Sequence, residues 1–314
     1  MFINIGLILI GFIVLFAGAE GLVRGSSSLA LRLGISPLVI GLTVVAFGTS
    51  MPELVVSIKT AITHHGSIAV GNVVGSNIFN IAVILGISAL ICPMKVKIQL
   101  VRLDAPVMIT VSLLFWFIFR DFHISRTEGI VLFSGIILYT LGNFLLARRE
   151  SDTKNTSGIE EIIPGTMKHI SSDFLFIIGG LGLLIAGSHA LVEGASGLAR
   201  LLGVSEAVIG LTIIAAGTSL PELATSVVAA FRREPDIAIG NVVGSNIFNI
   251  LCILGASSLI APLDGAGIRM TDIYVMLGTS ILLLPLLRTG FVLQRWEGSV
   301  LVGVYGVYLY FLLL

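Results

Sequence analysis

Long apolar segments follow one another along the chain, and short polar connections separate them. Each segment is long enough for an α-helix to cross the hydrocarbon core of a bilayer, which is about 30 Å thick. Most charged residues fall in the connections. The pattern therefore predicts an all-α membrane protein with ten transmembrane helices, at residues 2–23, 37–60, 68–92, 104–119, 127–147, 174–196, 205–230, 237–260, 271–287 and 294–313.

One polar stretch is much longer than the other connections and contains the run RRESDTKNTSGIEE. It divides the chain into a first unit of five helices at 1–147, a linker at 148–173 and a second unit of five helices at 174–314.

The composition excludes several classes of protein. Apolar residues make up 56% of the 314 residues and charged residues only 11%, against about 25% charged residues in a typical soluble domain. The continuous apolar runs also exclude a β-barrel, whose strands alternate. The formal net charge is zero, so nothing indicates a nucleic-acid partner. The two cysteines form no disulfide framework.

The two units repeat each other. Residues 36–90 align with 205–259 at a constant offset of 169 without gaps, and 33 of the 55 positions are identical. The same offset pairs the first predicted helix with the sixth. Five helices is an odd number, so the two units are expected to have opposite orientations in the membrane. Such inverted repeats are common among secondary transporters.

The positive charges of the connections predict the orientation, because cytoplasmic loops carry an excess of Lys and Arg. With the N-terminus outside, 13 of these residues lie on the inner side and five on the outer side. We therefore expect a multi-pass protein of the cell membrane, with both termini extracellular and the linker 148–173 cytoplasmic.

Glu53 and Glu222 differ from the other carboxylates because each lies well inside a predicted helix, at equivalent positions of the repeat. An ionisable group at that depth is costly unless it faces a cavity or a partner. No Lys or Arg lies at a comparable depth, so the natural counter-charge is an ion from solution. The alternative is a pair of protonated structural glutamates.

The neighbours of the two glutamates fit an ion site. Pro52 and Pro221 precede them, and a proline frees the carbonyl four residues earlier. Free carbonyls at membrane depth are tolerated only where they line a cavity. Thr49 and Thr218 share a helix face with the glutamates. Carboxylate, hydroxyl and carbonyl oxygens are typical ligands of hard cations such as Ca²⁺, or of Na⁺, whereas softer metals favour Cys, Met or His.

A polar stripe follows each glutamate in the next predicted helix, with one polar residue at every fourth position. Its members are Asn72, Ser76 and Asn80 in the first copy and Asn241, Ser245 and Asn249 in the second. The members that we assign to the ion site are Ser76, Asn80, Ser245 and Asn249. Both a site role and interhelical hydrogen bonding stay open for Asn72, Asn77, Asn241 and Asn246.

The repeated motifs resemble a known family. GTSMPEL with GNVVGSNIFNI, and GTSLPEL with GNVVGSNIFNI, are similar to the two α-repeats of the sodium/calcium exchanger family, of prokaryotic type, within the calcium/cation antiporter superfamily. The resemblance covers the whole chain. It implies ten helices in two inverted repeats, with helices 2 and 7 broken at the ions, and it implies that helices 1 and 6 slide to alternate access.

The resemblance also implies roles for individual residues. Glu53 and Glu222 would bind Ca²⁺, and Thr49 and Thr218 would contribute backbone carbonyls. Asn80 and Asn249 would lie near the middle of the cluster. The implied sodium ligands are Ala46, Thr49, Ser50 and Ser76 in the first half, and Ala215, Thr218, Ser219 and Ser245 in the second. Many relatives carry an aspartate at one of the two asparagine positions, so this departure leaves the number of sodium ions open. Potassium-dependent relatives typically have an acidic residue at the second position, so Asn249 argues against potassium dependence.

We therefore predict a secondary active antiporter that exchanges Ca²⁺ for Na⁺ across the cell membrane. It would be no enzyme, would need no cofactor and would function as a monomer in the lipid bilayer. The chain lacks the G-x-x-x-x-G-K-[ST] run of an ATP-driven pump. The nearest alternative is a proton-coupled Ca²⁺ antiporter. A cation channel is less favoured, because this chain carries its own inverted pair, and an intramembrane enzyme would need a nucleophile and a base.

Overall fold

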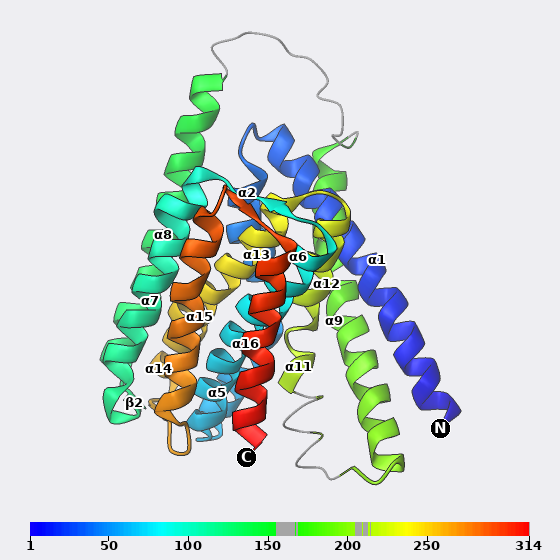
Figure 1. Ribbon diagram of the computed structural model, residues 1–314, viewed down its shortest axis with the longest axis vertical. Helices are drawn as coiled ribbons and strands as arrows, with labels where there is room; N and C mark the ends of the chain where they lie inside the picture. The colour runs from blue at the N-terminus through cyan, green and yellow to red at the C-terminus, as the bar shows by residue number, and fades with distance from the viewer. Residues whose placement is uncertain (155–166, 168, 205–208, 210–212, 214, 314) are drawn as a thin grey trace.

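The computed structural model describes residues 1–154, 167, 169–204, 209, 213 and 215–313, and Figure 1 traces the chain from end to end. The first half is a series of helices with two very short strands. Its elements are α1 (Phe2–Arg32), α2 (Pro37–Ile40), η1 (Gly41–Val45), α3 (Ala46–Thr49), α4 (Met51–Ile62), α5 (Gly66–Phe79), η2 (Asn80–Leu85), α6 (Gly86–Ile91), β1 (Met94–Lys95), η3 (Leu100–Asp104), α7 (Ala105–Ile118), η4 (Phe119–Asp121), β2 (His123–Ile124) and α8 (Arg126–Lys154).

The second half repeats the order of helices and strands in its described residues, but without counterparts of η3 and η4. Its elements are α9 (Ile170–Leu201), α11 (Ala215–Gly217), α12 (Leu220–Phe231), α13 (Pro235–Phe248), η7 (Asn249–Leu254), α14 (Gly255–Ile260), β3 (Leu263–Asp264), α15 (Met270–Arg288), β4 (Val292–Leu293) and α16 (Arg295–Leu313). The predicted linker 148–173 overlaps the ends of α8 and α9, and its residues 155–166 and 168 lie outside the described part, as does most of the first half of the helix predicted at 205–230.

Seven helices of the described residues are long and apolar enough to cross a membrane, and a bent pair makes a possible eighth. The bent pair is Pro37–Thr49 with Met51–Ile62, and the helix direction changes by 46° at the break between them. Helix α12 is apolar but shorter. Helix α16 has the length of α15, but Arg295, Glu297 and three tyrosines reduce its hydropathy. The chain is therefore a mostly helical membrane protein.

The first helix is longer than its apolar pattern predicts, because it runs to Arg32 rather than ending near residue 23. Its polar last turns have a partner on α9. Ser28 Oγ donates to Asp173 Oδ1 at 2.6 Å, and Arg32 Nε donates to Asp173 Oδ2 at 2.7 Å. Asp173 is fully buried, so this contact satisfies a carboxylate that would otherwise be costly to bury.

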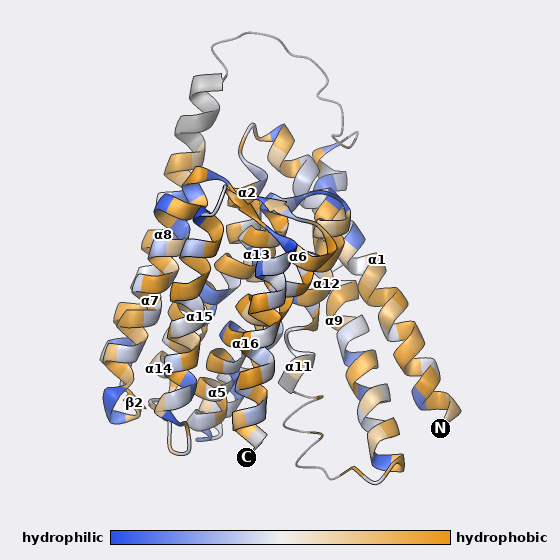
Figure 2. Ribbon diagram, viewed as in Figure 1, coloured by the Kyte–Doolittle hydropathy of each residue, from blue (hydrophilic) through white to orange (hydrophobic). Residues whose placement is uncertain are grey.

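Helices α1 and α9 form one antiparallel pair, packed through glycines. Gly11, Gly18 and Gly25 recur every seven residues on α1, and each faces the backbone of α9. A Cβ atom at Gly18 would lie 2.7 Å from the backbone nitrogen of Leu184, so only glycine permits this approach. Small residues are the usual means of close helix packing in membranes. Figure 2 shows that the rest of both helices is largely hydrophobic.

The core of the molecule consists of the two helices that carry the repeated GNVVGSNIFNI run. The most apolar window of Pro235–Ile260 is entirely buried, and that of Gly66–Ile91 is 67% buried, against 22% for α1 and 28% for α9. A helix that is buried on all sides belongs to the interior of a bundle. The α1–α9 pair thus lies at the periphery, against a core built from α5, α6, α13 and α14.

The two ends of the molecule can be told apart. Figure 1 shows both termini at one end, together with β2, whereas α8 ends and α9 begins at the other. Strand β2 pairs with β3 at the end that holds the termini. Strand β1 pairs with β4, and Lys97, just after β1, donates to Ser36 Oγ at the start of α2. Each end is therefore closed by a small antiparallel ribbon that joins the two halves.

Candidate cation-binding site

Both halves contain a broken helix at the predicted position. The first break lies at Ser50, between α3 and α4, and the second at Thr218 and Ser219, between α11 and α12. The two serines have nearly the same backbone conformation, with φ −83° and ψ 6° at Ser50 and φ −90° and ψ 6° at Ser219. Each break is followed by a proline in the first turn of the next helix. Proline is tolerated there because the first turn has no use for its missing backbone N–H.

The two breaks meet in the core through crossed hydrogen bonds. Ser50 Oγ donates to Glu222 Oε1 at 2.9 Å, and Ser219 Oγ donates to Glu53 Oε1 at 3.0 Å. The serine of each half therefore holds the glutamate of the other. Glu53 is 1% exposed and Glu222 is fully buried. Ser219 Oγ also lies within hydrogen-bond distance of Ser76 Oγ, at 3.1 Å, which joins the polar stripe of α5 to the same cluster.

Four buried oxygen atoms in this region have no hydrogen-bond donor among the described residues. They are Glu53 Oε2, Glu222 Oε2, Asn80 Oδ1 and Asn249 Oδ1. When the glutamates are ionised, all four can only accept, and no ion pair of the described residues involves either glutamate. A buried acceptor without a donor is costly, and a bound cation satisfies several at once. The repeat supplies these oxygens as two equivalent pairs.

Asn77 and Asn246 bind the side-chain amides of Asn249 and Asn80. Asn80 Nδ2 donates to Asn246 Oδ1 at 3.0 Å, and Asn249 Nδ2 donates to Asn77 Oδ1 at 2.9 Å. Asn77 and Asn246 in turn donate to each other's backbone carbonyls. These bonds fix the orientation of the Asn80 and Asn249 amides, whose oxygens have no donor among the described residues.

Asn80 and Asn249 also begin the π-helical segments η2 and η7. A π-helical turn interrupts the regular hydrogen bonding of an α-helix and is frequent at functional sites. The same irregularity therefore lies at the same point of both repeats.

Asn72 and Asn241 connect each broken helix to the helix that follows it. Asn72 Nδ2 donates to the Glu53 carbonyl and to Ser57 Oγ. Asn241 Nδ2 donates to the Glu222 carbonyl and to Ser226 Oγ. These bonds fix the backbone at the two glutamates. Together with the contacts of Asn77 and Asn246, they favour interhelical hydrogen bonding for the four asparagines that the sequence left open.

The two threonines have different surroundings. Thr49 is 1% exposed, and its hydroxyl donates to Asn241 Oδ1 at 3.0 Å. Thr218 is partly exposed, and its hydroxyl lies 3.5 Å from Asn72 Oδ1. The Ala46 carbonyl accepts from Ser245 Oγ at 3.5 Å. Ala215 lies in α11, and its side chain is outside the described part of the structure.

The structure thus places the predicted site residues on the two breaks and the two buried helices beside them. Hydrogen bonds join Thr49, Ser50, Glu53, Ser76, Ser219, Glu222 and Ser245 across or within the halves. No described group of three or more His, Cys, Asp or Glu residues forms a separate metal cluster. The candidate site is therefore built mainly from hydroxyl, amide and carbonyl oxygens around two carboxylates.

Two polar contacts of the α1–α9 pair were not predicted from the sequence. Ser188 Oγ donates to the Gly217 carbonyl at 2.6 Å, next to the second break. Glu20 pairs with Arg24 on its own helix, as its spacing suggests, but also with Arg232 at the end of α12, where Nε lies 2.8 Å from Oε2. The repeat gave no signal for either contact, because it pairs Ser188 with Ala19 and Arg232 with Thr63.

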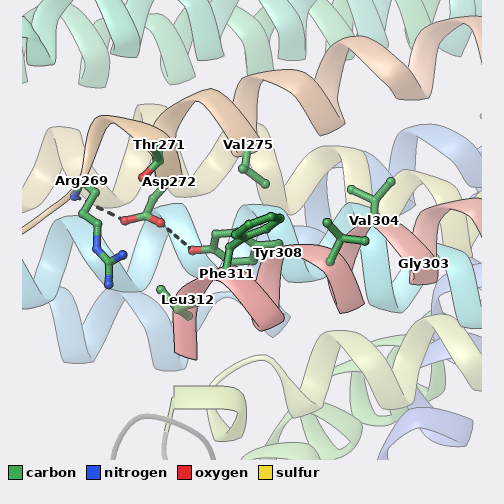
Figure 3. Close-up of a pocket in the computed structure, with 10 residues that line it drawn as sticks. Arg269, Thr271, Asp272, Val275, Gly303, Val304, Tyr308, Phe311 and Leu312 are labelled. Atoms are coloured by element: carbon green, nitrogen blue, oxygen red, sulfur yellow. Dashed lines mark hydrogen bonds between the residues drawn. The ribbon is translucent and has the colours of Figure 1, made fainter. Parts of the chain in front are cut away.

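A groove of about 780 Å³ lies away from these residues, between α15 and α16. Figure 3 shows Arg269 and Asp272 toward one end of it, the bond from Tyr308 to Asp272, and Gly303 and Val304 toward the other end. None of the predicted site residues lines this groove, so it is separate from the candidate cation site.

Comparisons with known proteins place the chain in a class of membrane transporters. The family model described as "Sodium/calcium exchanger protein" matches residues 3–145 and again 172–314. The two matches begin 169 residues apart and end 169 residues apart, which is the offset of the internal repeat. The chain therefore belongs to the sodium/calcium exchanger family.

Individual relatives match over nearly the full length. The chain is 39% identical to the putative antiporter CaxA of Alkalimonas amylolytica, covering 97% of both chains. It is 35% identical to the sodium/calcium exchanger MaX1 of Methanosarcina acetivorans, covering 98% of this chain and 97% of the relative. Its structure is similar to that of the sodium-calcium exchanger NCX_Mj soaked with zero Na⁺ and Ca²⁺, with a TM-score of 0.84, 32% identity and 99% coverage of both chains.

Proposed function

We propose that this protein is a secondary active antiporter that exchanges Ca²⁺ for Na⁺ across the cell membrane by alternating access. One observation carries the proposal most directly. Two buried glutamates are each held by a serine of the other half, while their second oxygens and two asparagine oxygens have no donor among the described residues. A cation supplies the missing partner. The family and its full-length relatives support the identity of the ions.

Each predicted residue receives a role in this proposal. Glu53 and Glu222 bind Ca²⁺ through their free oxygens, with backbone carbonyls of Thr49 and Thr218 and the nearby amide oxygens of Asn80 and Asn249. Sodium ions use hydroxyl and carbonyl oxygens of the same cluster. Those residues are Ala46, Thr49, Ser50 and Ser76 in the first half and Ala215, Thr218, Ser219 and Ser245 in the second.

The charge of the site favours exchange between these two ions. With Glu53 and Glu222 ionised, the cluster carries two negative charges, since Asn80 and Asn249 are neutral. One Ca²⁺ balances that charge, and so do two Na⁺. An unbalanced charge in a low-dielectric interior is costly, so an empty site is disfavoured in transit. This requirement couples the entry of one ion to the exit of the other.

The finer architecture belongs to the same proposal. Ten helices form two inverted repeats, with breaks in helices 2 and 7. The antiparallel α1–α9 pair, the equal offset of the two family matches and the position of both termini at one end all support it. Both termini are extracellular, the linker 148–173 is cytoplasmic, and a single chain in the bilayer is sufficient.

The topology can be tested by single cysteines in a background without Cys92 and Cys252. Ser157→Cys should be labelled by a membrane-impermeant reagent only from the cytoplasm, and Ala266→Cys only from outside. Ala266 is exposed, whereas a side chain at Gly265 would collide with Phe119. Labelling of both cysteines from the same face would contradict ten helices.

The exchange itself can be tested with purified protein in vesicles. We expect calcium uptake when an outward sodium gradient is imposed, saturation with calcium, and no uptake when potassium replaces sodium. A pH gradient of equal size should drive little uptake. Uptake that follows the pH gradient and ignores sodium would identify a proton-coupled antiporter, and uptake without a counter-gradient would identify a channel.

A further inference from the structure

The contact between Ser188 and Gly217 connects the peripheral α1–α9 pair to the candidate site. Ser188 lies on α9 and is only 8% exposed, and its hydroxyl donates to the Gly217 carbonyl at 2.6 Å. Gly217 is the last residue of α11 and directly precedes Thr218 and Ser219. The hydroxyl therefore acts on the backbone that positions the second break.

The Gly217 carbonyl is available for this bond because of Pro221. The residue four positions later in a helix normally donates its N–H to such a carbonyl, and proline has none. A carbonyl at membrane depth then needs a side-chain donor, water or an ion. Ser188 supplies the donor in the described structure.

The first half has no equivalent contact among the residues that the structure describes. The repeat pairs Gly217 with Gly48, which is followed by Pro52 in the same way, but it pairs Ser188 with Ala19. Alanine carries no hydroxyl. Next to Gly48, α9 instead presents the methyl groups of Leu181, which would lie 2.6 Å from a Cβ atom at that position. The polar connection between the α1–α9 pair and the breaks is thus one-sided.

The α1–α9 pair is packed as one unit, so a bond from α9 acts on both helices. Glycines bring the two backbones into contact along their length, and Asp173 binds Ser28 and Arg32 across the pair. Any displacement of this unit along the core must break the bond from Ser188 to Gly217.

We propose that Ser188 is a positioning residue that stabilises one of the two access states. This inference rests on the proposed antiport by alternating access. The favoured state is the one in the described structure, in which Gly75, on the α5 side of the site, is exposed and its equivalent, Gly244, is buried. When the α1–α9 unit moves, the bond is lost, and Ala19 offers no replacement at Gly48. The two states are therefore unequal even though the ion-binding motifs are repeated.

The expected effect follows from population shift. An ion's apparent affinity at one face falls with the fraction of protein that is open to that face. Hydrogen bonds between membrane helices change such equilibria by about threefold on average. Ser188→Ala should weaken apparent calcium affinity by up to about threefold at the face from which Gly75 is accessible, and should strengthen it at the opposite face.

The structure offers a matched control and a mirror variant. Ser196 lies on the same helix and is 4% exposed, but its hydroxyl has no hydrogen-bond partner among the described residues. Ser196→Ala therefore removes an equally buried hydroxyl without breaking a bond. Ala19→Ser places a hydroxyl at the equivalent position of α1, where it should stabilise the opposite state and shift the affinities in the same direction as Ser188→Ala.

The test measures sodium-driven calcium transport in vesicles of defined orientation, with calcium varied at one face at a time. A second measurement needs no transport. It is the rate at which a cysteine at Gly75, where no described residue lies within 4 Å of an added Cβ atom, reacts with an impermeant reagent in ion-free solution. Ser188→Ala should reduce this rate and Ser196→Ala should not. If the wild-type protein fails to exchange ions, the labelling rate still reports which of the two access states predominates.

We expect Ser188→Ala and Ala19→Ser to change the apparent affinity in opposite directions at the two faces and to slow the labelling. Ser196→Ala should do neither. The proposal is overturned if Ser188→Ala behaves like Ser196→Ala. It is also overturned if Ser188→Ala lowers the affinities equally at both faces, because that result indicates ordinary damage to the site.

Discussion

The same eleven residues, GNVVGSNIFNI, occupy two different environments in this protein. In α13, Gly240, Asn241 and Gly244 are buried, and a Cβ atom at Gly244 would lie 2.6 Å from the Leu42 carbonyl oxygen. In α5, the equivalent Gly75 is exposed, and no described residue lies within 4 Å of such an atom. The two copies of the motif therefore differ in exposure, and Leu211, the repeat equivalent of Leu42, lies outside the described residues.

This difference is what alternating access requires of a repeat. If the two halves exchange environments during transport, each copy must be able to form both the packed wall and the open wall. Gly75 has no close neighbour among the described residues. The proposed opposite state would bring a broken helix against Gly75. The repeated motif is then expected to serve both states.

The largest effect on transport should come from the buried glutamate that each half contributes. Glu53→Gln and Glu222→Gln should each reduce sodium-driven calcium uptake by about 100-fold or more, because each removes half of the site's negative charge in a buried position. Uptake into vesicles measures this, and Glu193→Gln, an exposed change on α9, is the control. Near-normal uptake in either variant would contradict an equal role for the two halves.

The next effect should separate the two environments. Gly244→Val should destabilise the protein by about 1–3 kcal/mol, because it overpacks the contact with Leu42. Gly75→Val should leave the melting temperature nearly unchanged but abolish exchange, because it prevents the packed wall from forming in the opposite state. Thermal unfolding and vesicle uptake of the same preparations check both statements. Equal loss of stability in the two variants would remove the distinction between the halves.

Smaller effects should come from the crossed serines. Ser50→Ala and Ser219→Ala each remove a donor to a glutamate and should weaken calcium binding by about two- to tenfold. Ser219 should give the larger change, since it also binds Ser76. Equilibrium calcium titrations compare the two variants, and a larger effect of Ser50 would show that the bond to Ser76 adds nothing.

The smallest effect should come from the pair of Glu20 with Arg232. Their side chains are 16% and 47% exposed, and partly exposed ion pairs contribute at most about 1 kcal/mol. Arg232→Gln should shift the apparent affinities at the two faces by less than about fivefold, and the shift should decrease at high ionic strength. Transport at two salt concentrations tests this, with His189→Gln as the control. An effect independent of salt would exclude an electrostatic origin.

Much of the fold was accessible from the sequence because hydropathy and the repeat are independent signals. The apolar runs predicted the long helices, and Pro52 and Pro221 indicated the breaks. The length of α1 was underestimated, since its polar end is stabilised by Asp173, which lies on another helix. Hydropathy along the chain carries no information on such a partner.

The site was partly accessible for a similar reason. Burial depth and the repeat identified Glu53 and Glu222, but they did not indicate that each would bind a serine of the opposite half. The orienting role of Asn77 and Asn246 depends on contacts between residues far apart in the chain. Ser188 was missed because it has no equivalent in the repeat, and the unequal packing of two identical motifs was not predicted.

Equilibrium binding of calcium to the purified protein tests the central claim most directly. Calorimetric titration in sodium-free buffer should show one calcium ion per chain, competition by added sodium, and no saturable binding in Glu53→Gln or Glu222→Gln preparations that unfold at the wild-type temperature. Saturable, sodium-sensitive calcium binding of wild-type strength in those two variants would show that the buried glutamates are not the site.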